Sequence, residues 1–375
     1  MEVSTSTFIG LIAVMLFMAA LTWVLLRALP RTRGKLRAET ARLDAAGRRS
    51  AATLLEDWGS AGGRALAAGI AALLVFGVGS ALWSAEIALP LVPGAVDDAV
   101  PMLLGLLAPI FAALVALGVL AWIVSRRRNP ETGTGSATSA GLRPRGTLTF
   151  GPRWALAIPS VAALVLCGWL VVTGLFSSRD GFGRFTVLEV ERLIAADDPA
   201  RGPVGPLTAQ TVTARHWPGW FVTVPSIVAA LLLLVLAALL LRALAQAAHP
   251  IDADLFGVDD LARTLKAKFV ATLAGSGLLA VLGGVATSTG GAMATLAGDM
   301  RMGADGPEFF YHEAMLSGYW IYLGAVLLNL LALLLLVVAI GAVLELAAAR
   351  RAAVAVALGE EPVPNPGGVR PGPLG

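Results

Sequence analysis

Seven long apolar runs, almost uninterrupted by charge, dominate the hydrophobic pattern of this 375-residue chain. Each run is about 19 residues or longer, which is enough for a helix to cross the ~30 Å hydrocarbon layer of a bilayer. The pattern therefore predicts an all-α fold, a polytopic bundle of seven transmembrane helices that forms one membrane domain over residues 1–350. The predicted spans are 8–26, 65–83, 102–124, 154–176, 220–241, 269–288 and 318–344.

The positive charges between the runs predict how the chain is oriented. One set of alternating segments carries 22 Lys and Arg residues, whereas the other set carries 6. By the positive-inside rule, the first set faces the cytoplasm. The N-terminus is then outside and the C-terminus cytoplasmic, which requires an odd number of spans. The cytoplasmic set comprises residues 27–64, 125–153, 242–268 and 345–375.

The composition supports the membrane prediction and limits the partners. Apolar residues make up 57% of the chain and charged residues 14%, against about 25% charged in soluble domains. The excess positive charge lies beside the spans, so we expect contact with the lipid bilayer and its anionic headgroups at the basic loop 27–64, and no binding of nucleic acid. Arginines far outnumber the three lysines, which is typical of a GC-rich bacterial genome. Together with the seven predicted spans, this favours a multi-pass protein of a bacterial plasma membrane.

The longer connections carry weaker local signals. The basic cytoplasmic loop 27–64 contains apolar residues whose spacing suggests a short interfacial helix. In the outer loop 177–219, Thr186 and Glu189 have the spacing of a helix capping box, and a helical apolar face follows. We therefore predict a short amphipathic helix there. The tail 351–375 is rich in Pro and Gly and is predicted to be disordered.

Polar side chains within the predicted spans are few, and none in the middle of a span is ionisable. A mid-membrane charge usually marks function, so its absence argues against a proton-coupled carrier or a voltage sensor. The sixth span is rich in Gly, Ser and Thr, which allow helices to approach closely. We expect this helix at the centre of the bundle. The candidate cavity or helix-packing residues are Asn329, Ser276, Thr272 and Thr287.

The sequence predicts no catalytic, cofactor-binding or metal site. The Gly275–Ser276–Gly277 segment invites comparison with intramembrane serine proteases, but no span contains a histidine that would activate the serine. His312 lies near loop methionines, a combination that suits Cu(I), yet an interfacial histidine explains it more simply. The single cysteine, Cys167, excludes an internal disulfide. We therefore expect no enzyme and no cofactor.

Two functional hypotheses remain. The first is a permease-like component of a transport or export system, which should have a polar cavity that reaches the membrane midplane. The alternative is a non-transporting scaffold or sensor that binds protein partners or forms a homo-oligomer, and it should be tightly packed. The substrate, if there is one, does not follow from the sequence.

Overall fold

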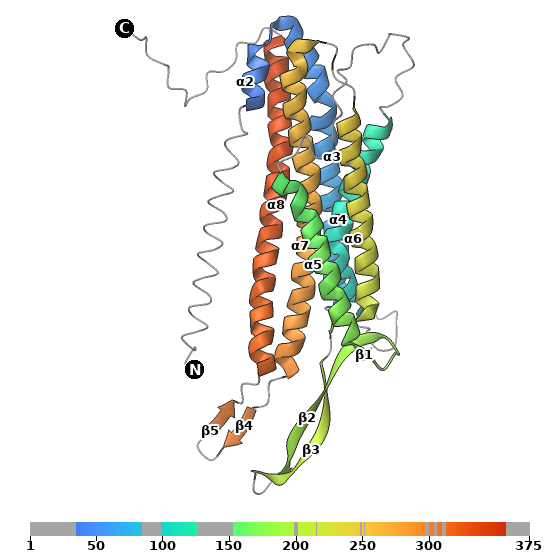
Figure 1. Ribbon diagram of the computed structural model, residues 1–375, viewed down its shortest axis with the longest axis vertical. Coiled ribbons are helices and arrows are strands. Elements are labelled where there is room, and N and C mark those ends of the chain that lie inside the picture. The colour runs from blue at the N-terminus through green and yellow to red at the C-terminus, as the bar shows by residue number, and fades with distance from the viewer. Residues whose placement is uncertain are drawn as a thin grey trace, which may run out of the picture.

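The computed structural model describes a mostly helical bundle whose long helices stand side by side (Figure 1). The described residues are 35–84, 99–126, 153–198, 202–214, 216–247, 250, 252–296, 300–303, 306–309 and 313–357. The helices are α2 (Lys35–Arg42), α3 (Ala45–Ser84), α4 (Ala99–Arg126), α5 (Arg153–Leu175), α6 (Trp220–Gln246), the 3₁₀ turn η1 (Ala253–Leu255), α7 (Phe256–Leu296) and α8 (Glu313–Ala357). Successive long helices pack as the pairs α3–α4, α5–α6 and α7–α8.

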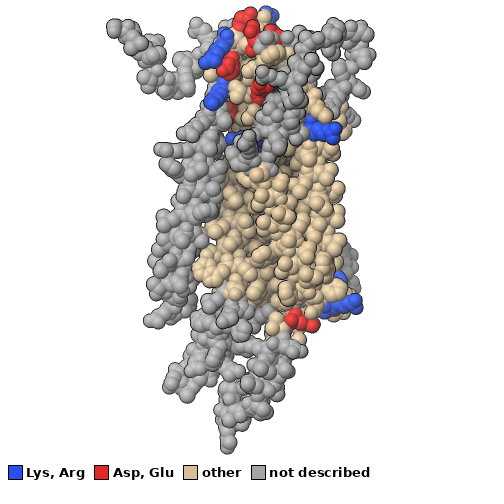
Figure 2. All heavy atoms as spheres, viewed as in Figure 1, with Lys and Arg blue, Asp and Glu red and all other residues tan. Residues whose placement is uncertain are grey.

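Six of the described helices, α3 to α8, are long and apolar enough to cross a membrane. They coincide with the second to seventh predicted spans, whereas the first predicted span, 8–26, lies outside the described residues. On the face shown in Figure 2, charged residues gather at the two ends of the molecule and leave an uncharged belt between them. Large apolar side chains on this belt are exposed, such as Leu164 at 75% and Leu333 at 57%. Such exposure is rare in soluble monomers, so the chain has the surface of a multi-pass membrane protein.

Helix α7 forms the core of the bundle, which confirms the prediction made for the sixth span. In its most apolar stretch 89% of the residues are buried, against 24–39% in the other five helices. Its glycines face different neighbours: a Cβ on Gly277 would lie 2.9 Å from Ala113 of α4, and one on Gly275 would lie 3.0 Å from Ile158 of α5. Small residues on several sides of α7 therefore let the surrounding helices approach it closely.

Three of the long helices continue well beyond their predicted spans. Together with α2 and η1, residues 45–64 of α3, 256–268 of α7 and 345–357 of α8 form what we call the head, at the end of the bundle that carries α2 (Figure 1). Leu36 and Leu55, which are 1% and 0% exposed, belong to the same buried cluster as the membrane core. The described part of loop 27–64 is thus mostly helical and packs on α7 and α8, rather than forming a separate interfacial helix.

The opposite end of the molecule, the hairpin end, carries β-strands that the sequence analysis missed. The prediction of an amphipathic helix in 177–219 is wrong, because Phe185–Asp198 (β2) pairs with Gly202–Ala214 (β3) in an antiparallel hairpin and β1 (Ser178–Arg179) adds a short third strand. Val190 faces Val212, and Glu189 faces Thr213. The many β-branched residues of both segments favour strands. A second small hairpin joins α7 to α8 through β4 (Met300–Gly303) and β5 (Gly306–Phe309).

The prediction that residues 351–375 are disordered is wrong for its first part, because helix α8 continues to Ala357 and residues 351–357 are helical. Residues 358–375 lie outside the described residues, as does most of the predicted cytoplasmic segment 125–153.

Candidate functional site

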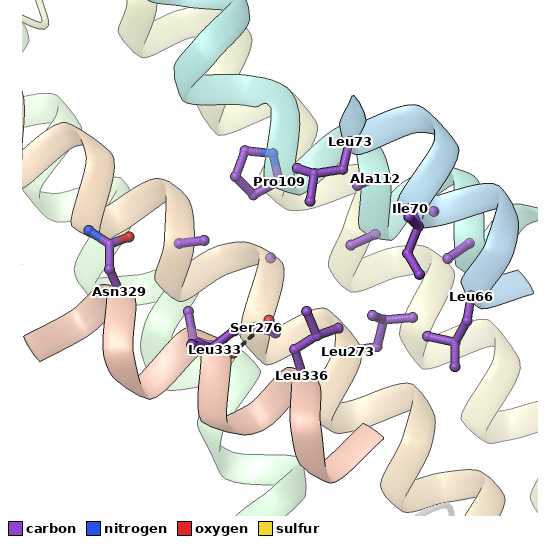
Figure 3. A pocket seen from close by; sticks show the side chains of 16 residues that line it. Leu66, Ile70, Leu73, Pro109, Ala112, Leu273, Ser276, Asn329, Leu333 and Leu336 are labelled. Carbon is purple, nitrogen blue, oxygen red and sulfur yellow. Dashed lines mark hydrogen bonds between the residues drawn. The ribbon is translucent and has the colours of Figure 1, made fainter. Parts of the chain in front are cut away.

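The four polar residues singled out by the sequence all lie on α7 and α8, but only two of them share a site. Ser276 and Asn329 line a cavity of about 230 Å³ between α3, α4, α7 and α8 (Figure 3). Thr272 and Thr287 are not part of its lining. Their hydroxyls donate hydrogen bonds within α7, to the carbonyl oxygens of Lys268 (2.7 Å) and Gly283 (2.8 Å). These two threonines therefore satisfy their own polar groups inside the helix.

The cavity lies within the uncharged belt and is almost wholly apolar. Its inner walls are built from small residues, which leave space because they extend no long side chain into it. At its rim Ile70 of α3 and Leu333 of α8 are 52% and 57% exposed, so the cavity reaches the side of the bundle between these two helices. The lining residues are Leu66, Gly69, Ile70, Leu73, Pro109, Ala112, Ala113, Ala116, Leu273, Ser276, Gly277, Ala280, Asn329, Ala332, Leu333 and Leu336.

Ser276 fixes α7 to α8 at the cavity wall. Its hydroxyl donates a hydrogen bond to the carbonyl oxygen of Ala332 at 2.8 Å, and the side chain is buried (Figure 3). An interhelical hydrogen bond within a membrane contributes about 0.6–2 kcal/mol. The hydroxyl is therefore engaged in helix packing.

Asn329 lines the cavity from α8 and makes its hydrogen bond within its own helix. Its Nδ2 donates to the carbonyl oxygen of Ala325 at 3.0 Å, which is a bond within α8. The amide also packs closely over α7, where a Cβ on Gly283 would lie 2.7 Å from the amide atoms. Asn329 is nevertheless exposed at the cavity mouth. It is therefore the polar group of the cavity that is accessible from the side of the bundle.

A buried group of charges in the head was missed by the sequence analysis. Arg263 Nε donates to Asp259 Oδ2 at 2.8 Å, and both side chains are less than 8% exposed. The Arg263 Nη1 also donates to the carbonyl oxygens of Leu244 (3.0 Å) and Ala247 (2.7 Å), at the C-terminus of α6. Arginine there satisfies carbonyls that have no partner within the helix and complements the helix dipole. The pair thus ties α6 to the head.

Other charged residues of the head are also buried. Lys266 and Lys268 are 6% and 8% exposed, although the sequence places them in a cytoplasmic loop. Glu345, just after the last predicted span, is also buried, at 8% exposure. These three residues are buried because α7 and α8 continue as helices beyond the predicted spans and pack together in the head. The i, i+4 spacing of Asp259 and Arg263 is the signal in the sequence that indicates a helical ion pair.

At the hairpin end, the Asp180 carboxylate bonds to the residues that lead into β2. It accepts hydrogen bonds from the backbone N–H groups of Phe182 and Arg184, both at 2.8 Å, and from the Thr186 hydroxyl at 2.9 Å. The Arg184 guanidinium lies 3.0 Å from the carboxylate. Burial raises the pKa of Asp180, but the hydrogen bonds together outweigh it and hold the pKa below its ordinary value. Thr186 thus bonds to Asp180 rather than capping a helix.

Tryptophan and glycine residues attach this hairpin to the bundle. Trp217 is 5% exposed, and its indole N–H donates to the carbonyl oxygen of Thr173 in α5 at 2.7 Å. A Cβ on Gly219 would clash with the carbonyl oxygen of Phe185, so the backbones of β2 and of the segment before α6 are in direct contact. The hairpin is therefore attached by the Trp217 indole and by a close backbone contact at Gly219.

The described residues offer hydrogen-bonding groups, an apolar cavity and a buried ion pair. They contain no group of three or more His, Cys, Asp or Glu residues suited to a metal ion. Cys167 is a free, half-buried thiol in α5. No known protein family, curated protein or solved structure matches this chain. The site consequently has to be interpreted from its own geometry.

Proposed function

We propose that this protein is a seven-span bacterial plasma-membrane protein with its N-terminus outside and its C-terminus in the cytoplasm. The positively charged segments support this orientation, because residues 35–64, 256–268 and 345–357 gather in the head. The less basic segment 177–219 lies at the hairpin end. In this orientation the head is cytoplasmic.

Labelling from one side of the membrane tests the orientation. In a Cys167→Ala background, Gly181→Cys and Ser50→Cys place thiols at exposed positions of the hairpin end and the head. No atom lies near the added Cβ at Gly181. A membrane-impermeant maleimide should label only the Gly181→Cys variant in intact cells, and both variants after lysis. Labelling of Ser50→Cys in intact cells would contradict the proposed topology.

We further propose that the protein is a non-transporting scaffold, without catalytic activity, that binds protein partners through the head. The observation that carries this proposal is that α2, α3, α7 and α8 form a packed body which continues the buried core outside the uncharged belt. Its surface mixes acidic and basic residues (Figure 2), including Glu39, Arg42, Arg49 and Asp260. Mixed charge suits a protein surface, whereas the arginines nearest the belt, such as Arg64, would contact anionic lipid headgroups.

The permease hypothesis stays a prediction. It requires a polar path at the midplane, whereas the cavity between α3, α4, α7 and α8 is apolar and reaches the lateral surface. Reconstitution distinguishes the two hypotheses. Liposomes that contain the protein should show the same flux of several polar solutes as protein-free liposomes. Flux above this background that falls in Ser276→Ala or Asn329→Leu variants would overturn the scaffold proposal and favour the permease.

Partner binding requires its own measurement. A photo-crosslinking amino acid at Arg49, on the exposed surface of the head, should form a discrete protein adduct in cells. The same group at Leu232, a 56% exposed residue in the uncharged belt on α6, serves as the matched control. Charge reversal of neighbouring head residues (Arg42→Glu) should abolish the Arg49 adduct. Absence of an adduct at the head would contradict partner binding there.

A further inference from the structure

The side-chain amide of Asn329 uses only part of its hydrogen-bonding capacity. A side-chain amide offers two N–H donors and a carbonyl oxygen with two lone pairs. One N–H is donated to the carbonyl oxygen of Ala325. Among the described residues, no other hydrogen-bond partner lies within reach of this amide. One N–H and the carbonyl oxygen therefore remain available on an exposed residue within the uncharged belt, where no water replaces the missing partner.

Asn329 lies on a continuous apolar stripe of α8. Tyr322, Val326, Leu333 and Val337 are each 40–57% exposed, and together with Asn329 they are spaced three or four residues apart. Residues at this spacing share one side of a helix. Repeated three-four spacing of this kind is the pattern by which one helix packs along another.

Helix α3 forms the other wall of a groove beside this stripe. Ile70 and Leu74 of α3 are 52% and 58% exposed. The 230 Å³ cavity opens between Ile70 and Leu333, next to Asn329 (Figure 3). At the head α3 and α8 are in direct contact, since a Cβ on Gly62 would lie 3.1 Å from Val343. The groove therefore widens from the head toward the cavity.

We propose that a second copy of this chain packs into the α3–α8 groove and that two Asn329 side chains form the central hydrogen-bonded pair. Two copies inserted in the same orientation are related by a two-fold axis along the membrane normal, so each residue on that axis meets its counterpart at the same depth. Each amide then donates its remaining N–H to the carbonyl oxygen of the other. A lipid acyl chain has no donor for this oxygen, so the self-complementary amide favours a second copy over lipid. The proposal is independent of the partner that binds the head.

The first test is dimerisation in lipid bilayers, measured by single-molecule photobleaching of labelled protein at decreasing protein-to-lipid ratio. Because both copies carry the substitution, Asn329→Leu removes both hydrogen bonds of the pair and should lower the association constant about 8- to 800-fold. Asn329→Gln, which keeps the amide, should recover part of the association. Wild-type protein that stays monomeric at every density, or equal association by Asn329→Leu, would overturn the proposal.

A second test leaves Asn329 intact and does not depend on how that variant folds. In a Cys167→Ala background, Val326→Cys should form a disulfide-linked dimer upon mild oxidation in the membrane, because Val326 lies one turn from Asn329. Leu232→Cys, on α6 and more exposed than Val326 (56% against 40%), should nevertheless link only at the slow rate of random collisions. Equal rates at both positions would place the interface elsewhere, and a Val326→Cys adduct with a different protein would show that another membrane helix fills the groove.

Discussion

The two ends of the bundle are stabilised by different means. In the head, apolar side chains cover a buried ion pair, and Arg263 joins Asp259 to the C-terminus of α6. At the hairpin end, helices and strands approach through backbone atoms. There α7 and α8 cross so closely that a Cβ on Gly290 would lie 2.6 Å from the carbonyl oxygen of Gly318.

Because of this difference, the stability of the two ends should respond to different substitutions. A buried charge is stable only while its partner remains, so the head should tolerate a change of both partners better than a change of one. A close backbone contact has no spare volume, so the hairpin end should be sensitive to a single added methyl group. Loss of one charged partner is therefore expected to destabilise the head, and one added methyl group the hairpin end.

The largest effect is expected in the head. Arg263→Met removes the 2.8 Å ion pair with the buried Asp259 carboxylate and the donor to the Leu244 and Ala247 carbonyls. The expected loss is about 3–5 kcal/mol of unfolding free energy, measurable by thermal unfolding in detergent. Arg42→Met is the control, because the Arg42–Glu39 pair is exposed and should contribute about 0–1 kcal/mol. If the Asp259→Leu/Arg263→Met double variant is no more stable than Arg263→Met, the explanation by an orphaned charge fails.

The second effect concerns the α7–α8 crossing at the hairpin end. Gly290→Ala would place a methyl group 2.6 Å from the Gly318 carbonyl oxygen and 2.8 Å from the Tyr322 nitrogen, so the helices must separate. We expect a loss of about 1–3 kcal/mol. The neighbouring Gly291 has no atom within 4 Å of an added Cβ, so Gly291→Ala should be neutral or stabilising by up to about 1 kcal/mol. Similar melting temperatures for the two variants would contradict the close crossing.

An effect of similar size, confined to the hairpin, is expected where the hairpin attaches to α5. Trp217→Phe removes the indole donor and leaves the buried Thr173 carbonyl oxygen without it, at a cost of about 1–3 kcal/mol. Amide hydrogen exchange should accelerate in β2 and β3 while protection in the head stays unchanged. Trp320→Phe, at a 54% exposed position, is the control. Faster exchange in the head would show that the two ends are not independent.

The smallest effect is a dependence on pH at the entry into β2. Because hydrogen bonds hold the pKa of Asp180 below its ordinary value of 3.8, its contribution to stability is present above that value and is lost as the pH falls through the folded-state pKa. Hydrogen-exchange protection of Phe182 and Arg184 should therefore decrease below about pH 4. Asp180→Asn should lower the protection at neutral pH and remove this pH dependence. An unchanged pH profile in that variant would assign the effect to another group.

The sequence predicted the part of the fold that depends on the length of the apolar runs, namely the positions of the long helices. Six spans were located because about 20 consecutive apolar residues are a strong signal. The helix ends in the head were missed. Hydropathy shows where an apolar run ends, but a helix such as α7 continues beyond its apolar run. The strand β2 was missed because Val187, Val190 and Ile194 fit a helical face, whereas the β-branched content of the segment favoured a strand.

The candidate site was predictable in part. Ser276 and Asn329 were identified because polar side chains are rare in apolar runs, and both line the cavity. The cavity itself was not predictable, since its lining residues come from four helices that are brought together only by the tertiary fold. The buried Asp259–Arg263 pair was hidden because the positive-inside rule treats every basic residue between spans as part of a loop.

The three long helices that extend into the head, α3, α7 and α8, contain no proline, whereas α4, α5 and α6 each have a proline inside the helix. At 1.5 Å per residue, each of the three extends about 60 Å or more as an unbroken rod. Straight, rigid helices transmit a tilt at one end to the other end. A tilt of about 5° imposed on the head by a bound protein would displace their far ends by about 5 Å, so a mechanical signal could cross the bilayer without any molecule passing through it.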